Sequence, residues 1–417
     1  MSQGMSARTW LLVTGMFVTG ILNSLVTKCP GAPVLYSQPV WQTLQMFVGE
    51  LSGLLVYAVH VVRRRQRRRE RERARAARGE NQSLLSVGDE SYVAPYGSVH
   101  ASFLRVNVPG LFGGLLGPDG DPARVRARIQ QGWRLAVLFV VPALCDIGAT
   151  TLMNSALILM PVSIFQMTRG ALVLWVGLFS VLFLHHRLRL YEWVSLVLVM
   201  LGVAVVGLSS LVVHDPRAVL ARVLGGAGVA ESSPVADALL GLAMVLGAQV
   251  FAALQFVYEE KVMGDHEVEP MLAVGLEGLF GSLLVLALMP VLHFFIGSTE
   301  WGRGGYFDMV TGWRQLVGVR RVLWGSVLCA SSIALYNIFG LSVTRLVSAT
   351  ARSTIDTFRT LGITFISIAL GWEVLQPLSG LMQALGFASL AYGTFVFNGV
   401  LAPPRVLLSR EEREELA

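Results

Sequence analysis

Two arginines stand inside apolar stretches of this sequence, each with similar neighbours at the same spacing. A serine, an amide or acid, and an arginine follow one another at intervals of three residues twice, as Ser163, Gln166 and Arg169 and again as Ser353, Asp356 and Arg359. This spacing places each set on one face of a helix. Guanidinium groups bind carboxylates and phosphates through paired hydrogen bonds. The pattern therefore predicts a binding site for an anionic or zwitterionic solute.

Other polar residues in the first half also have a counterpart in the second half. Asp146 and Asn337 precede the two arginines by nearly the same distance, and Glu50 corresponds to Glu277. We expect Asp146 and Asn337 to join the solute site. Glu50 and Glu277 are candidates for proton coupling, one for each gate. Burial and a nearby arginine act in opposite directions on the proton affinity of a carboxylate, and the sequence does not decide between them.

Several of these residues also have a purely structural interpretation. Serine and asparagine inside a membrane commonly join helices to one another, which is the favoured interpretation of Ser163, Ser353 and Asn23. Ionisable groups at such depth normally face a bundle interior or a water-filled cavity, because burying an arginine at mid-membrane costs roughly 2.5–3.5 kcal/mol. Asp356 and Arg359, one turn apart, could still neutralise each other.

The elements that carry these residues must lie in a membrane. The chain has 417 residues, of which 54% are hydrophobic and 14% are charged, whereas soluble domains carry about 25% charged residues. Ten windows are apolar over the length that a membrane span needs, namely 8–28, 40–62, 134–158, 160–184, 190–212, 235–258, 271–293, 318–344, 346–370 and 376–398. We predict an all-α polytopic membrane protein whose ten transmembrane helices form two inverted five-helix repeats.

The predicted repeats divide the chain into two halves. Residues 8–212 would form the first repeat and residues 235–398 the second, joined by a lumenal connector at 213–234. Residues 399–417 would form a cytosolic tail. The insertion at 63–133 is rich in arginine, glutamate, serine, glycine and proline, a composition that predicts disorder over most of its length. Glu259 to Lys261 stand at an expected span end, where we expect water to solvate them.

A basic run sets the orientation of the spans. Ten arginines fall between Arg63 and Arg78, directly after an apolar window. The positive-inside rule places this loop and both termini in the cytosol, although Arg314, Arg320 and Arg321 fall on the opposite side. We expect the run to attract anionic membrane lipids and not to bind nucleic acid.

The same insertion contains a short sorting motif. Glu80 is followed, after three residues, by Leu84 and Leu85. This pattern resembles the dileucine signal that sorting adaptors read on proteins bound for endosomes and lysosomes. Because the pattern is short, it is a hypothesis about targeting.

Enzymatic chemistry has little support in the sequence. The seven histidines fall in loops or near span ends, and no Ser/His/Asp arrangement or CxxC pair is present. The three cysteines are scattered, which argues against a disulfide framework and a zinc site. We therefore expect a protein that is not an enzyme and that needs no cofactor and no metal.

Six short blocks together resemble a known family. They are Pro142–Asp146, Phe165–Gly170, Gly177–Val181, Tyr258–Lys261, Val274–Gly281 and Leu370–Glu373. These blocks are similar to solute carrier family 35, subgroup F, within the drug/metabolite transporter superfamily, and the likeness extends from about Met16 to Gly399. The Arg63–Arg78 segment departs from that pattern.

The resemblance implies a secondary transporter that moves a small organic solute by alternating access. It also implies an endomembrane location, with lysosomes or endosomes favoured and Golgi or mitochondria as alternatives. The expected partners are a small-molecule solute, membrane lipids and sorting adaptors. The alternative function is a receptor or scaffold that acts through the basic cytosolic loop.

Overall fold

The computed structural model describes residues 7–28, 38–77, 130, 132–160, 162–214, 234–266, 268–299, 307–370 and 377–403. Within these ranges the chain is helical and has no strand. The helices are α1 (Ala7–Lys28), α3 (Pro39–Ala77), α6 (Val140–Leu159), α7 (Val162–Thr168), the 3-10 helix η1 (Arg169–Ala171), α8 (Leu172–Leu184), α9 (Leu190–His214), α11 (Pro234–His266), α12 (Pro270–Leu292), the π-helix η2 (His293–Gly297), α13 (Met309–Gly318), α14 (Arg320–Leu346), α15 (Ala349–Ala369) and α16 (Pro377–Phe397).

Eight helical segments among the described residues are long and apolar enough to cross a membrane. They are Pro39–Arg63, Gly132–Leu157, Ile164–Leu184, Leu190–Ser209, Ala238–His266, Pro270–Gly297, Arg320–Leu346 and Ser379–Phe397. The architecture is therefore that of a polytopic membrane protein. Two helices that the sequence predicted as spans, α1 and α15, are not among these eight. The apolar stretch of α1 is shorter, Thr9–Ser24. Helix α15 carries the charges of Arg352, Asp356 and Arg359, which lower its hydropathy. The count of ten spans stays a prediction.

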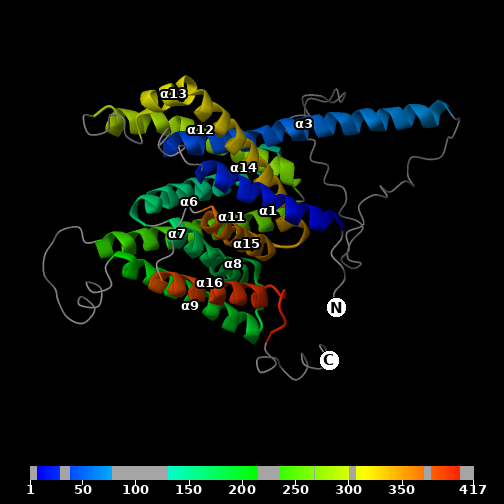
Figure 1. Ribbon diagram of the computed structural model, residues 1–417. Coiled ribbons are helices and arrows are strands. Elements are labelled where there is room, and N and C mark those ends of the chain that lie inside the picture. Colours follow the sequence, from blue (N-terminus) through cyan, green and yellow to red (C-terminus); the bar gives the residue numbers. More distant parts are fainter. Residues whose placement is uncertain are drawn as a thin grey trace, which may run out of the picture.

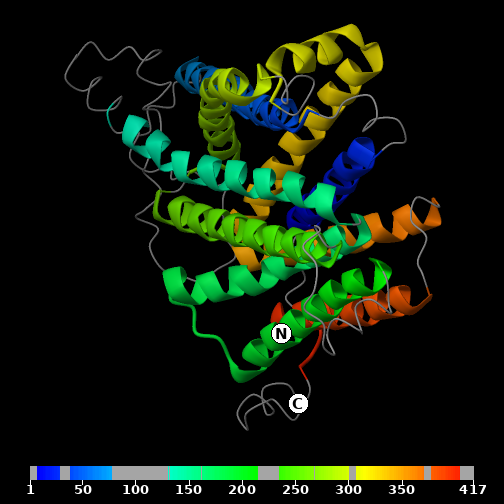
Figure 2. The ribbon, with the colours of Figure 1, turned by 90° about the vertical axis from the view of Figure 1, so that its left-hand side faces the viewer.

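Four helix pairs make the most extensive contacts. They are α9 with α16, α3 with α12, α6 with α11, and α1 with α14. Figure 1 shows α9 and α16 side by side at the lower side of the molecule and α3, α12 and α13 at the upper side. Helices α8, α11 and α15 lie between these two groups, and the turned view in Figure 2 keeps this order.

Small residues allow the closest of these helix contacts. A Cβ atom on Gly386 of α16 would lie 2.8 Å from the carbonyl oxygen of Gly202 on α9. A Cβ atom on Gly278 of α12 would lie 2.4 Å from the backbone nitrogen of Leu51 on α3. Close approach of helix backbones at small residues is the usual way in which membrane helices associate.

Helix α3 continues well beyond the predicted span end. It runs for 39 residues, or about 58 Å at 1.5 Å per residue, so residues 63–77 are helical where the sequence predicted disorder. The reason is that arginine, glutamate, glutamine and alanine are strong helix formers. Figure 1 shows this half of α3 extending away from the bundle. The predicted sorting residues Glu80, Leu84 and Leu85 lie outside the described residues, as do residues 215–233 of the predicted connector.

Two further elements differ from their predicted boundaries. Helix α11 continues to His266 instead of ending near residue 258, so Glu259 to Lys261 lie within it. An additional helix, α13, precedes α14. Its N-cap is Asp308, whose side chain accepts a hydrogen bond from the backbone nitrogen of Thr311. A short capped helix of this kind carries little apolar length, which is why the search for spans missed it.

Candidate functional site

Arg169 lies where its helix is interrupted. Helix α7 ends at Thr168, residues Arg169–Ala171 form the 3-10 turn η1, and α8 begins at Leu172. A short 3-10 stretch within a helix often marks a hinge. Interrupted helices also occur at transport sites, where they bring polar groups to a cavity. The interruption therefore presents Arg169 at a point where the helix axis can change.

Four polar residues meet at Arg169 and form what we name the arginine cluster. They are Arg169 on η1, Tyr336 on α14, and Asp356 and Arg359 on α15. Nη2 of Arg359 lies 2.6 Å from Oδ1 of Asp356, and the Tyr336 hydroxyl donates to that same oxygen at 2.5 Å. Nη2 of Arg169 lies 3.9 Å from Oδ2 of Asp356. One carboxylate thus faces two guanidinium groups, which leaves one positive charge in excess.

The arginine cluster is almost enclosed, and some of its polar atoms have no partner. The side chains of Asp356 and Arg359 are 5% exposed, whereas that of Arg169 is 19% exposed. Among the described residues, the Nε atoms of both arginines and Oε1 of Gln166 are buried without a hydrogen-bond partner. Gln166 stands one helical turn before Arg169. An unsatisfied buried polar group costs about 1–3 kcal/mol, so a solute oxygen at Arg169 would be stabilised.

Helix α1 covers the arginine cluster from one side. A Cβ atom on Gly20 would lie 2.3 Å from Cδ of Arg359 and 3.0 Å from the ring of Tyr336. The Arg359 guanidinium also stacks on this ring, with Cζ 4.7 Å from its centre. Arg359 is thus fixed by Asp356, Tyr336 and α1, while Arg169 is the more accessible cation.

A second group, which we name the carboxylate cluster, gathers acids from four helices around one arginine. Its members are Glu50 on α3, Asp146 on α6, Glu259 on α11, Glu277 on α12 and Arg352 on α15. Nη1 of Arg352 lies 2.6 Å from Oε2 of Glu259, and both residues are at most 1% exposed. The Arg352 guanidinium also lies 3.8 Å from the ring centre of Phe256. A buried, doubly supported ion pair therefore joins α11 to α15.

Two of the remaining acids of the carboxylate cluster, Glu50 and Glu277, accept hydrogen bonds from side-chain amides. Gln255 donates from Nε2 to Oε1 of Glu277 at 2.6 Å and to Oε1 of Glu259 at 3.2 Å. Asn337 donates from Nδ2 to Oε1 of Glu50 at 2.5 Å. Asp146 interacts electrostatically with Glu50 and Glu277. Hydrogen bonds and the ion pair thus join Glu277, Glu259 and Arg352 through Gln255, while Glu50 and Asp146 interact with them electrostatically.

The structure groups the predicted site residues differently from the sequence analysis. Asn337 contacts Glu50, and Asp146 belongs with the carboxylates, whereas both were expected beside the arginines. Glu50 and Glu277 lie in one cluster, and their assignment to two gates stays a prediction. The cause is the packing of α3, α6 and α12 against α11 and α14, which the spacing along the chain does not reveal. Their roles stay predictions.

Three residues of these clusters were missed by sequence reasoning. Glu259 was expected to be solvated at a span end but is fully buried, because α11 continues past it. Arg352 and Tyr336 were not singled out. Arg352, Asp356 and Arg359 occupy positions i, i+4 and i+7 of α15, a one-face spacing that could have identified Arg352.

Among the three residues with a structural interpretation, Asn23 is the one that the described contacts place between two helices. The hydroxyl of Ser353 donates to the carbonyl of Thr350 at 2.7 Å. Oδ1 of Asn23 on α1 accepts from the hydroxyl of Ser332 on α14 at 3.2 Å. The Asn23 contact agrees with the helix-joining interpretation, whereas the Ser353 contact stays within α15. The side chain of Ser163 lies outside the described residues.

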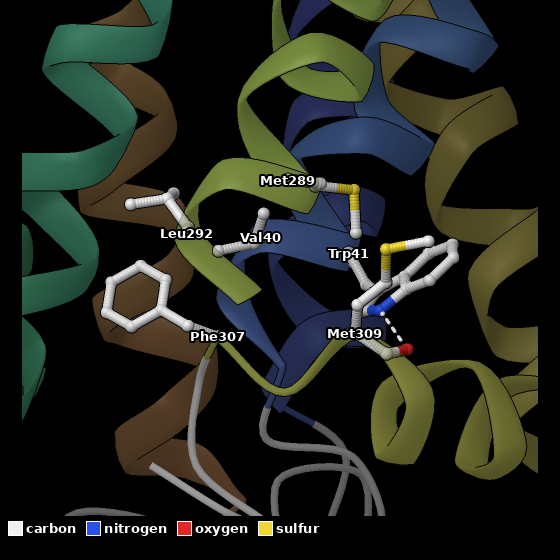
Figure 3. Close-up of a pocket in the computed structure, with 6 residues that line it drawn as sticks. All are labelled: Val40, Trp41, Met289, Leu292, Phe307 and Met309. Atoms are coloured by element: carbon white, nitrogen blue, oxygen red, sulfur yellow. Dashed lines mark hydrogen bonds between the residues drawn. The ribbon is translucent and has the colours of Figure 1, made fainter. Parts of the chain in front are cut away.

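A small apolar pocket lies apart from both clusters. Figure 3 shows its six lining residues, Val40, Trp41, Met289, Leu292, Phe307 and Met309. Nε1 of Trp41 donates to the carbonyl of Met309 at 3.3 Å, which ties α3 to α13. No ionisable side chain lines this pocket. It is therefore unsuited to the charged solute that the arginines predict.

The amino-acid sequence of the chain is similar to those of known transporters. Residues 123–299 match the nucleotide-sugar transporter family. The chain is similar to solute carrier family 35 member F6 of Mus musculus, with 39% identity over 285 residues that cover 66% of this chain and 70% of that protein. The Homo sapiens protein of that name is 40% identical over 282 residues, with the same two coverages. The UDP-galactose translocator of Canis lupus familiaris is 30% identical over 190 residues, 45% of this chain and 40% of that protein.

Proposed function

Because this chain belongs to solute carrier family 35, in its subgroup F, we propose that it is a secondary-active transporter whose arginine cluster binds a small anionic or zwitterionic organic solute. The observation that carries the proposal is the excess of guanidinium over carboxylate at Arg169. A carboxylate or phosphate of the solute would complete this charge balance. Nucleotide-sugar-like and amino-acid-like metabolites both offer such a group.

Alternating access between two inverted five-helix repeats is the mechanism that we propose. If α1 and α15 are counted as spans, the ten spans in chain order are α1, α3, α6, α7 with α8, α9, α11, α12, α14, α15 and α16. An inverted repeat relates span one to span six, span two to span seven, and so on. This relation maps the α3–α12 pair onto itself and the α9–α16 pair onto itself. The same relation maps the α6–α11 pair onto the α14–α1 pair, and these are the four most extensive helix contacts. This agreement supports a pseudo-twofold relation, which would let the two halves rock around a central solute site.

The proposed location is an endomembrane, with lysosomes or endosomes favoured and both termini in the cytosol. The apolar helices and the family support an integral membrane protein. The basic half of α3 would then lie on the cytosolic side, where anionic lipids attract arginine.

Transport in proteoliposomes tests the solute site. The purified protein is reconstituted and offered a panel of radiolabelled nucleotide sugars, nucleotide monophosphates and amino acids. We expect uptake of at least one solute, and Arg169→Ala to lower its apparent affinity about 10- to 150-fold, because a hydrogen bond to a charged group contributes about 1.5–3 kcal/mol. Arg345→Ala is the matched control, since Arg345 is exposed near the end of α14. Equal affinities of wild type and Arg169→Ala would contradict the assignment.

A receptor or scaffold is the second candidate function. The observation that favours it is the exposed basic half of α3, which extends away from the bundle and offers a surface to an acidic partner. Neutralising the arginines of that surface separates the two functions, because transport does not need them whereas scaffolding does.

A further inference from the structure

We propose that the last turns of α11 and the first turn of α15 form a gate, and that two contacts from consecutive residues of α11 hold it closed. The two residues are Glu259 and Glu260, and we name their contacts with α15 the latch. The inference rests on the proposed transport function and deepens it, because it names the residues that control access to the solute site. In the proposed orientation this gate closes the cytosolic side of that site.

The first contact of the latch is a buried ion pair. Nη1 of Arg352 lies 2.6 Å from Oε2 of Glu259, and the two side chains are 2% and 0% exposed. The ring of Phe256 supports the guanidinium, and a Cβ atom on Gly340 of α14 would lie 2.9 Å from its Nε. Separating such a pair leaves two buried charges without compensation. The contact therefore resists movement of α15 away from α11.

The second contact of the latch fixes the first residue of α15. Oε2 of Glu260 accepts a hydrogen bond from the backbone nitrogen of Ala349 at 2.9 Å. Helix α15 begins at Ala349, so Glu260 satisfies one of the backbone N–H groups that have no partner within the helix. A negative charge is also favourable at this end of a helix. Two consecutive residues of α11 thus bind the backbone and a side chain of the first turn of α15.

An apolar cluster packs beside the latch and joins three helices. Its buried members are Leu172 and Val176 on α8, Ala253, Phe256 and Val257 on α11, and Ala349 on α15. Trp175 and Phe179 of α8 pack against this cluster. A charged solute loses its hydration in such surroundings and gains no polar partner, which is strongly unfavourable. Passage of the solute therefore requires α15 to move away from α8 and α11.

The latch lies between the solute site and one face of the membrane. Arg352 stands close to the beginning of α15, whereas Asp356 and Arg359 of the arginine cluster follow later in the same helix. At 1.5 Å per residue, Arg352 is about 6 Å nearer to the beginning than Asp356 and about 10 Å nearer than Arg359. A solute that approaches Arg169 from the face on which α15 begins therefore meets the latch and the apolar cluster first.

Helix α15 connects the gate with the solute site. It carries Arg352 of the latch and, one turn later, Asp356, which faces Arg169. A tilt of α15 that separates Arg352 from Glu259 also changes the position of Asp356 relative to Arg169. Opening of the gate and binding of the solute therefore influence each other through one rigid element, as rocking of two halves around a central site requires.

A cysteine beside the latch can report its opening. Cys145 on α6 is 6% exposed and interacts electrostatically with Glu259. The chain has three cysteines, so Cys29→Ser with Cys329→Ser gives a full-length parent protein in which Cys145 is the single thiol. This parent is placed in sealed vesicles, and a membrane-impermeant, negatively charged thiosulfonate is added to the face on which α11 ends. The rate at which Cys145 is modified measures gate opening without any transported solute.

We expect Glu259→Gln in this parent to be modified about tenfold faster, which corresponds to about 1.4 kcal/mol in favour of the open gate. Glu260→Ala should raise the rate by a smaller factor, because it removes one hydrogen bond and leaves the ion pair in place. Lys261→Gln is the matched control, since Lys261 is the next residue of α11 and is exposed. If Glu259→Gln does not fold, Glu260→Ala decides, because Glu260 is only partly buried.

The outcomes separate the gate from the transport function. Faster modification in the latch variants, with Lys261→Gln at the rate of the parent, supports the gate. Rates equal to that of the parent in both latch variants would overturn it, as would equal acceleration when the reagent is added to the opposite face. Absence of any solute exchange by the wild type would count against the transport function, while the modification rates would still decide whether the latch closes this end of the bundle.

Discussion

Arg169 and Arg359 share one carboxylate, but their surroundings give them different tasks. Arg359 bonds Asp356 directly, stacks on Tyr336 and lies against α1. Arg169 is farther from Asp356 and more exposed. Arg359 therefore holds the cluster together, and we propose Arg169, the more exposed of the two, as the cation that binds the solute.

This difference predicts that alanine variants of the two arginines have different defects, one in stability and the other in solute affinity. Arg359→Ala should lower the free energy of unfolding by about 3–5 kcal/mol, because it removes the close partner of a buried carboxylate. Arg169→Ala should leave the unfolding temperature nearer to that of the wild type and act mainly on solute affinity. Thermal unfolding of the purified proteins in detergent compares them. A larger loss of stability in Arg169→Ala would reverse the assignment.

At this scale the sequence predicted part of the site. Arg169, Arg359 and Asp356 were visible because charged residues are rare in apolar stretches, and the structure does bring them together. The partners of the other residues were not visible, since Asn337 and Glu50 are separated by 287 positions. Glu259 was misjudged because an error of a few residues in a helix end decides whether a carboxylate is buried or solvated.

Among the helices, α1 packs against one side of the arginine cluster. Helical glycine normally costs stability relative to alanine, by about 1 kcal/mol, so Gly20 requires a packing reason. The reason is the room that it leaves for Arg359. The helices themselves were mostly predicted from apolar length. Helix α13 and the interruption at Arg169 were not, because neither has a signal in hydropathy.

A pair of glycine substitutions tests this role of α1. Gly20→Ala should displace Arg359 and weaken solute transport, since the new Cβ atom would lie 2.3 Å from Cδ of Arg359. Gly325→Ala on α14 is the matched control, because beyond the neighbouring backbone of its own helix nothing lies within 4 Å of its new Cβ. We expect this control to transport normally and to gain up to about 1 kcal/mol of stability. Equal transport by both variants would show that α1 does not position Arg359.

At the scale of the whole molecule, one helix joins the bundle to a basic arm. Helix α3 carries Glu50 within the bundle and exposed arginines beyond it. The sequence predicted the charge of this arm correctly but predicted disorder, because composition alone does not register the helix that the preceding span nucleates. The inverted repeat and the number of spans stay predictions.

Neutralising the arm distinguishes a transporter from a scaffold. The exposed arginines to be changed to glutamine are Arg63, Arg67, Arg69, Arg71 and Arg73. Transport in liposomes of neutral lipid should be unchanged, because none of these residues belongs to either cluster. Any increase in transport that anionic lipid produces in the wild type should be smaller in the variant. Loss of transport in neutral lipid would assign the arm a direct part in the transport cycle.

Tyr336 and Asn337 are consecutive on α14, and this adjacency limits how that helix can move. Consecutive side chains of an α-helix point about 100° apart around its axis. A roll of α14 that brings Asn337 closer to Glu50 therefore swings Tyr336 along a different arc relative to Asp356. Shortening the Tyr336–Asp356 contact and shortening the Asn337–Glu50 contact therefore require different rotations of α14 about its axis. The rotation angle of α14 then indicates which of the two contacts is the shorter.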